Sequence, residues 1–192
     1  EEAGLLVAGF SELQPLLEKA LAHEAEDDIA HEMATTARGL AKAAEILSGQ
    51  FMLVATNVPY LGRGKQGEIM QAYCECVHPQ AKADLATSFV ERCLDFCTQS
   101  GNATLVTPHN WLFLPTYKKV REDLLFRCQW KFVARLGARA FEAISGEVVN
   151  VALMAICASL PRKESMMCGL DVADAKSASE KAAYLTGQGQ AQ

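Results

Sequence analysis

The sequence predicts an α/β fold, because short apolar runs alternate along the chain with segments of helical periodicity. The runs at 51–55 and 104–107 have the length and composition of strands buried on both faces of a sheet. Residues 84–98 and 117–128 place apolar side chains three and four positions apart, as amphipathic helices do. This alternation favours parallel pairing of the first two strands.

Two more apolar runs, at 132–136 and 148–156, are expected to be strands. Only residues 137–147 separate them, which is too short for a helical crossover, so this pair is predicted to be antiparallel. Residues 161–192 are rich in Ala, Ser, Gly and Gln and are expected to form a flexible tail. The α/β region is therefore predicted to span residues 48–160.

The first 47 residues differ from the rest in charge. They carry ten acidic residues against three basic ones. Ser11 and Gln14 match a capping box, and apolar residues between Ile29 and Leu47 recur at spacings of three and four. We expect an acidic helical segment over residues 1–47.

Composition excludes several classes of protein. Half of the residues are apolar and 21% are charged, which is typical of a globular domain rather than a disordered chain. The longest apolar run, at 148–160, is well short of the roughly 20 residues that span a membrane. Seven cysteines without a framework spacing favour a reducing compartment, so we expect a cytoplasmic protein.

Two weak motifs lie in the middle of the chain. Residues 62–67 match the dinucleotide pattern G-x-G-x-x-G, but five residues separate them from the preceding strand, so a mobile loop is expected instead. Cys74, Cys76 and His78 offer three metal ligands without a second pair nearby. We therefore expect free thiols and no metal.

The charge pattern leaves two interpretations open. A net charge of -5 is unfavourable for a stand-alone nucleic-acid-binding protein, since Lys and Arg supply most non-specific affinity. A local basic band nevertheless faces only Glu122 and Asp123; it comprises Lys118, Lys119, Arg121, Arg127, Lys131, Arg135 and Arg139. This band is suited either to a nucleic-acid backbone or to ordinary solvated helix faces.

The tetrapeptide Asn57–Tyr60 directly follows the first predicted strand. Open α/β sheets bind their ligands at such strand ends. Asn57 offers an amide oxygen, Val58 a backbone carbonyl and Tyr60 an aromatic ring, a set suited to a planar amine or amide. An ordinary strand-to-loop turn is the alternative, because Asn and Pro are common in turns.

At this tetrapeptide the sequence resembles amino-group methyltransferases, whose fourth motif reads Asn or Asp, Pro, Pro, and Tyr or Phe. Residues 51–61 resemble the strand and catalytic loop of N6-adenine DNA methyltransferases, and residues 105–111 resemble the next strand and its loop. The stretches 136–141 and 146–149 are similar to BREX phage-exclusion methyltransferases (PglX-like) and their type IIG restriction-modification relatives. The resemblance covers roughly residues 40–160 in order.

The resemblance implies a partial Rossmann-like, S-adenosylmethionine-dependent methyltransferase fold, the C-terminal half of the sheet with helices before it. It implies methylation of a flipped adenine in double-stranded DNA, in restriction-modification or phage defence. Asn57, Val58, Pro59 and Tyr60 would be the catalytic positions. Tyr60 and Phe141 would stack on the base, and Asn57 would also contribute to the cofactor site.

Two departures from the family pattern affect these expectations. Val58 replaces the first proline, and we expect a proline to be tolerated there because the carbonyl is retained. The glycine-rich cofactor loop and the target-recognition domain are missing, so the chain is expected to be part of a larger enzyme and inactive by itself. The alternatives are a protein glutamine N5-methyltransferase and a non-catalytic interaction module with the same fold.

Overall fold

The computed structural model describes residues 28–141 and 149–188, together with the single positions 15 and 19. The chain divides into two compact units, Glu1–Gly49 and Gln50–Gln192, each described by itself. In the first unit, helix α2 (Asp28–Ser48) lies within the segment predicted to be helical, and it leaves Leu40 and Leu47 exposed. None of the described helices is long and apolar enough to cross a membrane.

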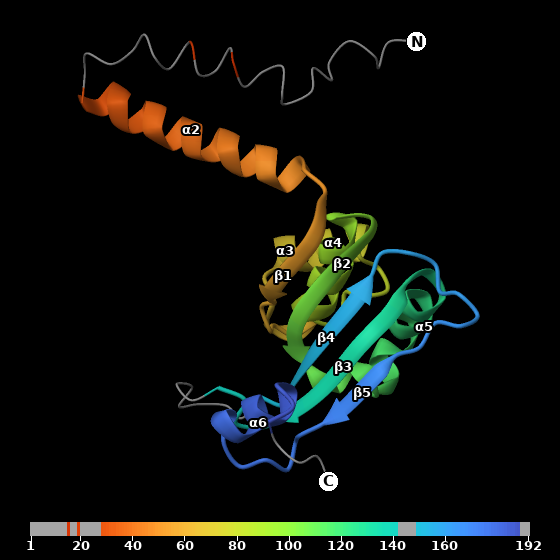
Figure 1. Ribbon diagram of the computed structural model, residues 1–192. Helices are drawn as coiled ribbons and strands as arrows, with labels where there is room; N and C mark the ends of the chain where they lie inside the picture. Colours follow the sequence, from red (N-terminus) through yellow and green to blue (C-terminus); the bar gives the residue numbers. More distant parts are fainter. Residues whose placement is uncertain (1–14, 16–18, 20–27, 142–148, 189–192) are drawn as a thin grey trace. The chain divides into compact units, whose positions relative to one another are not determined.

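The second unit is built on a five-stranded sheet in the order β1-β2-β4-β3-β5 (Figure 1). The strands are β1 (Phe51–Asn57), β2 (Cys97–Pro108), β3 (Gln129–Gly137), β4 (Val151–Cys157) and β5 (Cys168–Asp171). β1 and β2 pair in parallel, whereas β4 runs antiparallel to both β2 and β3. The predicted pairing of the first two and last two strands is therefore confirmed, while β5 is a strand that the sequence patterns did not predict.

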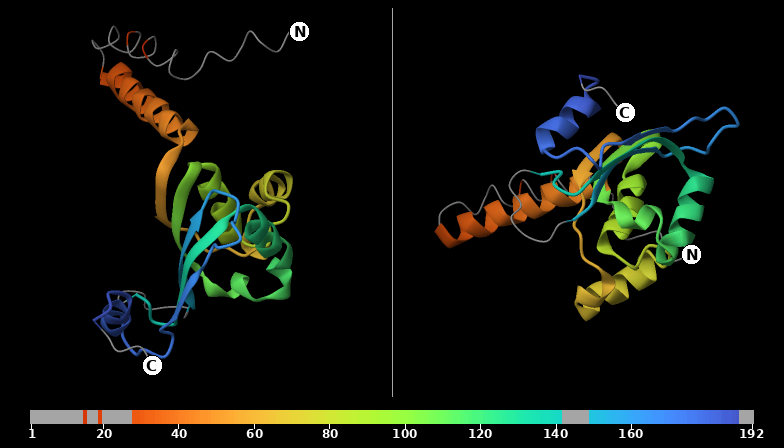
Figure 2. Two further views of the ribbon diagram at one scale, coloured as in Figure 1. Left: turned by 45° about the vertical axis from the view of Figure 1, so that its right-hand side comes forward. Right: turned by 90° about the horizontal axis from the view of Figure 1, so that it is seen from below.

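Helices cover both faces of this sheet (Figure 2). One face carries α3 (Glu68–Val77), α4 (Leu85–Asp95) and α5 (Lys118–Arg127), and the other carries α6 (Ala178–Leu185). The predicted helices at 84–98 and 117–128 correspond to α4 and α5. Asp84 begins α4 by accepting a hydrogen bond from the Ala86 amide at 2.8 Å, which satisfies one of the free amides of the first turn.

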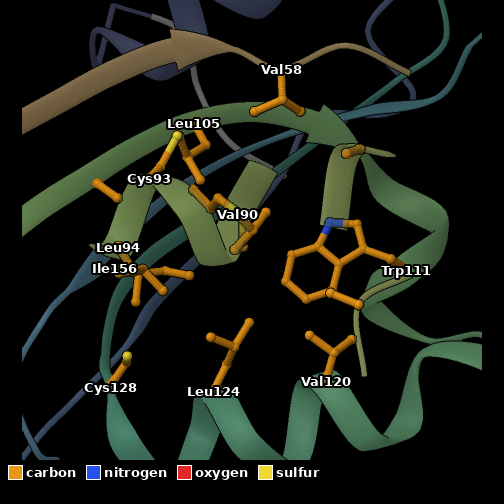
Figure 3. Close-up of a cluster of buried hydrophobic side chains, with 14 of the residues drawn as sticks. Val58, Val90, Cys93, Leu94, Leu105, Trp111, Val120, Leu124, Cys128 and Ile156 are labelled. Atoms are coloured by element: carbon orange, nitrogen blue, oxygen red, sulfur yellow. The ribbon is translucent and has the colours of Figure 1, made fainter. Parts of the chain in front are cut away.

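The main core lies between the sheet and helices α4 and α5. Figure 3 shows Val90 of α4 and Leu124 of α5 facing the sheet residues, with Trp111 beside them. The Trp111 side chain is 1% exposed, and its indole N–H donates to the Thr107 hydroxyl at 3.1 Å. This packing holds the segment after β2 firmly against the end of the sheet.

β1 is less buried than its composition predicts. Met52 is 67% exposed and Leu53 is 61% exposed, so the expectation of a strand covered on both faces is wrong for the described residues. The described residues give β1 one neighbouring strand, β2. An apolar run shows that burial is favourable, but it does not show which residues provide the cover.

The predicted flexible tail at 161–192 is also wrong, because this stretch contains β5 and α6. β5 pairs in parallel with β3, and α6 packs Tyr184 and Leu185 against a second apolar cluster that includes Leu136 and Val151. An apolar face only eight residues long is too short to give a clear helical period among so many small residues.

Lys181 connects α6 to the sheet, and Gly137 allows the chain after β5 to approach the end of β3 closely. Lys181 is 2% exposed, and its ammonium donates to three backbone carbonyls, those of Leu136, Val172 and Ala173, at 2.7, 3.1 and 3.3 Å. Burial lowers the pKa of Lys181 from its ordinary value. Gly137 has a φ of 66°, and a Cβ there would lie 2.9 Å from the Ala173 Cβ, so both its conformation and the close approach require glycine.

Candidate active site

The tetrapeptide Asn57–Tyr60 begins at the carboxyl end of β1. Asn57 is the last residue of the strand and stands in register with Val106 of β2. The next amide, that of Val58, donates to the Val106 carbonyl at 3.2 Å and continues the ladder by one residue. The Val58 side chain is 3% exposed and points into the main core (Figure 3). The loop therefore leaves the sheet from a fixed position.

This geometry reverses the expectation that proline would be tolerated at position 58. Val58→Pro removes the N–H that binds Val106, and we expect it to lower the free energy of unfolding by about 1–3 kcal/mol, the cost of leaving a buried carbonyl unpaired. The measurement is urea unfolding of the chain. Val58→Ile keeps both the N–H and an apolar branched side chain; if it is as destabilising as Val58→Pro, the backbone hydrogen bond is not the cause.

Tyr60 and Asn57 are joined directly. The Tyr60 hydroxyl donates to Oδ1 of Asn57 at 3.1 Å. The phenol is half-buried, and burial raises the pKa of Tyr60 from its ordinary value, so it remains a neutral donor near pH 7. A carbonyl oxygen has two lone pairs, so Asn57 Oδ1 retains one for a further donor. The bond orients the amide and the aromatic ring relative to each other.

Tyr60 opens onto a cleft of about 620 Å³ formed by four loops. The loops follow β1 and β2, precede α4 and precede β4. They contribute Tyr60, Leu61, Gly62, Arg63, Gly64, Lys65, Ala83, Asp84, Pro108, His109, Asn110, Val149 and Asn150. The cleft thus lies at the carboxyl ends of the parallel pair β1 and β2, which is where such sheets bind ligands.

The loop at 62–67 is held in place, contrary to the mobile loop that the sequence predicted. The Arg63 amide donates to the Ala83 carbonyl at 3.0 Å, and the Leu61 amide donates to Asp84 at 3.3 Å. The Gln66 side chain, 5% exposed, donates to the Leu61 carbonyl at 2.9 Å. The glycine pattern gives no information on a hydrogen bond from a side chain to the backbone, such as that of Gln66.

Two residues of the cleft were not singled out from the sequence. Asp84 accepts hydrogen bonds from the Ala86 amide at the start of α4 and from the Leu61 amide. An acidic residue directly before a segment of helical periodicity is the sequence signal for such a helix cap. His109 has its Nδ1 buried without a hydrogen-bond partner among the described residues. Burial, and then the nearby Arg135, lower the pKa of His109 below 6.5, so its ring is neutral at pH 7. No sequence pattern signals that environment.

The remaining predicted site residues are more dispersed. Phe141 is 39% exposed and lies outside both apolar clusters, and it is not among the residues lining the cleft. Residues 142–148 lie outside the described part of the chain, so the second stacking role of Phe141 stays a prediction. Pro59, between Val58 and Tyr60, is exposed.

The three candidate metal ligands in the last turns of α3 and at its C-terminal cap do not converge. All seven cysteines are free thiols, with Cys74 buried and Cys76 exposed on another side of α3. Nδ1 of His78 lies 2.8 Å from a Glu91 carboxylate oxygen, which joins α3 to α4. Within the described residues, no group of three His, Cys, Asp or Glu side chains is placed to bind a metal ion.

Comparison with known proteins gives consistent results. The family model for the Eco57I restriction-modification methylase matches residues 8–141. The adenine-specific methyltransferase PglX of Lacticaseibacillus casei (strain Zhang) is 34% identical over 132 residues, which are 68% of this chain and 11% of that protein. The adenine-specific methyltransferase BrxX of Escherichia coli O9:H4 (strain HS) is 34% identical over 106 residues, which are 55% of this chain and 9% of that protein. The chain thus spans about a tenth of the length of these relatives.

Solved structures agree on the fold. A nuclease-deletion mutant of the Type ISP restriction-modification enzyme LlaGI, in complex with a DNA substrate mimic, matches with a TM-score of 0.56 and 14% identity over 90% of this chain and 18% of that chain. A Listeria monocytogenes protein assigned as a class I S-adenosylmethionine-dependent methyltransferase matches with a TM-score of 0.53 and 11% identity, over 74% of this chain and 43% of that chain. These matches confirm the expected partial Rossmann-like methyltransferase fold. The family match establishes that the chain belongs to the Eco57I restriction-modification methylase family.

Proposed function

We propose that the full-length protein transfers a methyl group from S-adenosylmethionine to N6 of an adenine extruded from double-stranded DNA, as part of restriction-modification or phage defence. Family membership supports the reaction class. The observation that carries the proposal is the hydrogen bond from Tyr60, which lines the cleft, to Asn57 at the end of β1, because it joins an amide oxygen to a flat ring. We propose a cytoplasmic location, because seven cysteines without a framework spacing favour a reducing compartment.

The proposed role of the loop is to position the amine. The second lone pair of Asn57 Oδ1 and the Val58 carbonyl accept the two N–H groups of the adenine amine. These bonds hold the nitrogen lone pair in one direction and increase its electron density as the new bond forms, so the acceleration comes from positioning and fixed dipoles. The loop keeps this geometry because Val58 is anchored in the core.

Stacking on aromatic rings is proposed to hold the extruded base. Tyr60 provides one ring, at the edge of the cleft, and Phe141 is the proposed second. Base–aromatic stacking is worth about 1–3 kcal/mol per base, which offsets part of the cost of unstacking the adenine from the duplex.

The described residues provide only part of a cofactor site. S-adenosylmethionine supplies the electrophilic methyl group when it is bound. Asn57, at the end of β1, is the residue of this chain proposed to border it. The glycine-containing loop at 62–67 does not match a cofactor loop, because residues 58–61 separate it from the end of β1, whereas a cofactor loop follows its strand directly.

The test is the reaction of the full-length protein. Incubated with S-adenosylmethionine and unmethylated DNA of mixed sequence, it should produce N6-methyladenine, measured by mass spectrometry of the digested nucleosides. Methylation of glutamine in a peptide instead would identify a protein methyltransferase. No transfer to either substrate would indicate an interaction module.

Tyr60 allows ring and hydroxyl to be tested apart. Tyr60→Ala should weaken capture of the extruded adenine about 5- to 150-fold, the stacking energy converted at 1.4 kcal/mol per tenfold. Tyr60→Phe keeps the ring and loses only the bond to Asn57, so it should retain most of the capture. The readout is fluorescence of 2-aminopurine at the target position. Equal losses in both variants would show that the hydroxyl, and not stacking, accounts for the role of Tyr60.

A further inference from the structure

We propose that the loop Gly62–Gly67 is a DNA phosphate-binding element, with Lys65 as the residue that contacts the backbone beside the extruded adenine. The inference rests on the proposed function. It gives a role to the glycine-containing motif, which neither the cofactor nor the proposed chemistry uses. Three observations carry it: the placement of the loop, its rigidity and the distribution of partners among its basic side chains.

The first observation is that the loop lies in the cleft. Gly62, Arg63, Gly64 and Lys65 line the same cleft as Tyr60, the proposed stacking residue. An adenine held at Tyr60 remains covalently attached to its own strand, so the phosphates on either side of it must run along the rim of this cleft. A cation on that rim is therefore close to the backbone and away from the reacting amine.

Because the loop is rigid, forming this contact costs little conformational entropy. Besides the bonds to Ala83 and Asp84, the Gln71 side chain donates to the carbonyls of Arg63 and Gln66 at 3.1 and 2.8 Å. Residues 63–65 form a short 3-10 helix that these bonds connect to α3 and to the segment before α4. A preformed loop loses little conformational entropy when a ligand binds.

The two cations of the loop differ in their partners. Arg63 contacts the Glu75 carboxylate at 3.1 Å and the Gln71 carbonyl at 3.4 Å, so its charge is used to fix the loop to α3. Glu75 is shared with Lys82 at 2.6 Å, and Lys82 first, then Arg63, lower the pKa of this carboxyl. Lys65 is exposed, and no hydrogen bond or ion pair holds its ammonium among the described residues. It is the cation of the loop available to a phosphate.

The basic band at 118–139 is a weaker candidate for DNA contact. Most of its charges already have partners within the described residues: Lys118 with Glu122, Arg127 with Asp123, Arg135 with Asp171, Arg121 with two backbone carbonyls and Lys131 with Gln129. The interpretation of this band as solvated, internally paired faces is thereby favoured. Lys119 is an exposed lysine of the band outside these pairs and does not line the cleft, which makes it a matched control.

The experiment compares Lys65→Gln and Lys119→Gln in the full-length protein. DNA affinity is measured over a salt range of about 0.1–1 M, in which the release of counterions can be followed. Loss of one phosphate contact should reduce the slope of log K against log salt by about 0.9. Lys65→Gln should therefore weaken binding about eightfold at the low-salt end and hardly at all at the high-salt end. The effect should be larger for DNA with the target sequence than for DNA without it, because the contact depends on the extruded adenine, and Lys65→Arg should restore it.

The outcomes separate this inference from the proposed function. If the wild type forms N6-methyladenine and Lys65→Gln leaves the salt slope unchanged, or changes it no more than Lys119→Gln, the phosphate role is wrong while the function stands. If Lys65→Gln keeps the slope but lowers methylation per bound DNA, Lys65 acts on the base and the inference is overturned. If the wild type forms no N6-methyladenine, the proposed function fails by its own test.

Discussion

Replacing Trp111 by alanine is expected to lower the free energy of unfolding by about 3–5 kcal/mol. The indole is 1% exposed and lies between α5 and the end of β2, against Val120 and 5.8 Å from the ring of Trp130 (Figure 3). Truncation leaves a cavity in the main core and removes the donor to Thr107. A loss of this size changes the folding equilibrium about a hundredfold to several thousandfold, a large part of the stability of an ordinary domain.

Urea unfolding followed by far-ultraviolet circular dichroism measures this effect. Phe126→Ala on α5 is the matched control, because that ring is 79% exposed and its removal should change stability by no more than about 0.5 kcal/mol. A cost below about 1 kcal/mol for Trp111→Ala would contradict the placement of the indole in the core.

The helices that the sequence predicted are those whose buried apolar residues recur at a regular spacing. Leu124 and Val120 of α5, and the apolar face of α4, are buried against the sheet at helical spacing, so their pattern alone identifies them. The antiparallel β3–β4 pair followed from the short connection between two apolar runs. In each case the information is local.

The elements that the sequence missed depend on distant partners. Lys181 is an ordinary surface residue by type, and only the fold brings three carbonyls to its ammonium. The exposure of Met52 depends on which elements pack against β1. A run of apolar residues contains no information on those elements.

The candidate site divides in the same way. The tetrapeptide was recognisable by its order of residues after a strand, and the family match supports it. The bond from Val58 to Val106 and the bond from Tyr60 to Asn57 depend on how the loop leaves the sheet, which residue types do not specify. The first of these bonds is the reason that we now expect proline to be destabilising at position 58.

Asn57→Ala in the full-length enzyme is expected to reduce methylation about 10²–10³-fold, the usual effect of removing one preorganised group that stabilises charge in a transition state. DNA affinity should be nearly unchanged, because phosphate contacts dominate binding and the amide acts only on the amine. The measurements are the rate of N6-methyladenine formation per bound DNA in a single turnover and the equilibrium affinity for the same duplex.

Asn57→Asp is the variant that tests the role of the amide oxygen. A carboxylate keeps an oxygen that accepts from both Tyr60 and the amine, so this variant should retain clearly more activity than Asn57→Ala. If the two variants were equally inactive, the NH₂ group of Asn57 would be essential and the acceptor role would be wrong. If Asn57→Ala instead weakened DNA binding and kept its rate per bound duplex, Asn57 would act in recognition. The loop would then hold the base through Tyr60, and the Val58 carbonyl would remain as the acceptor for the amine.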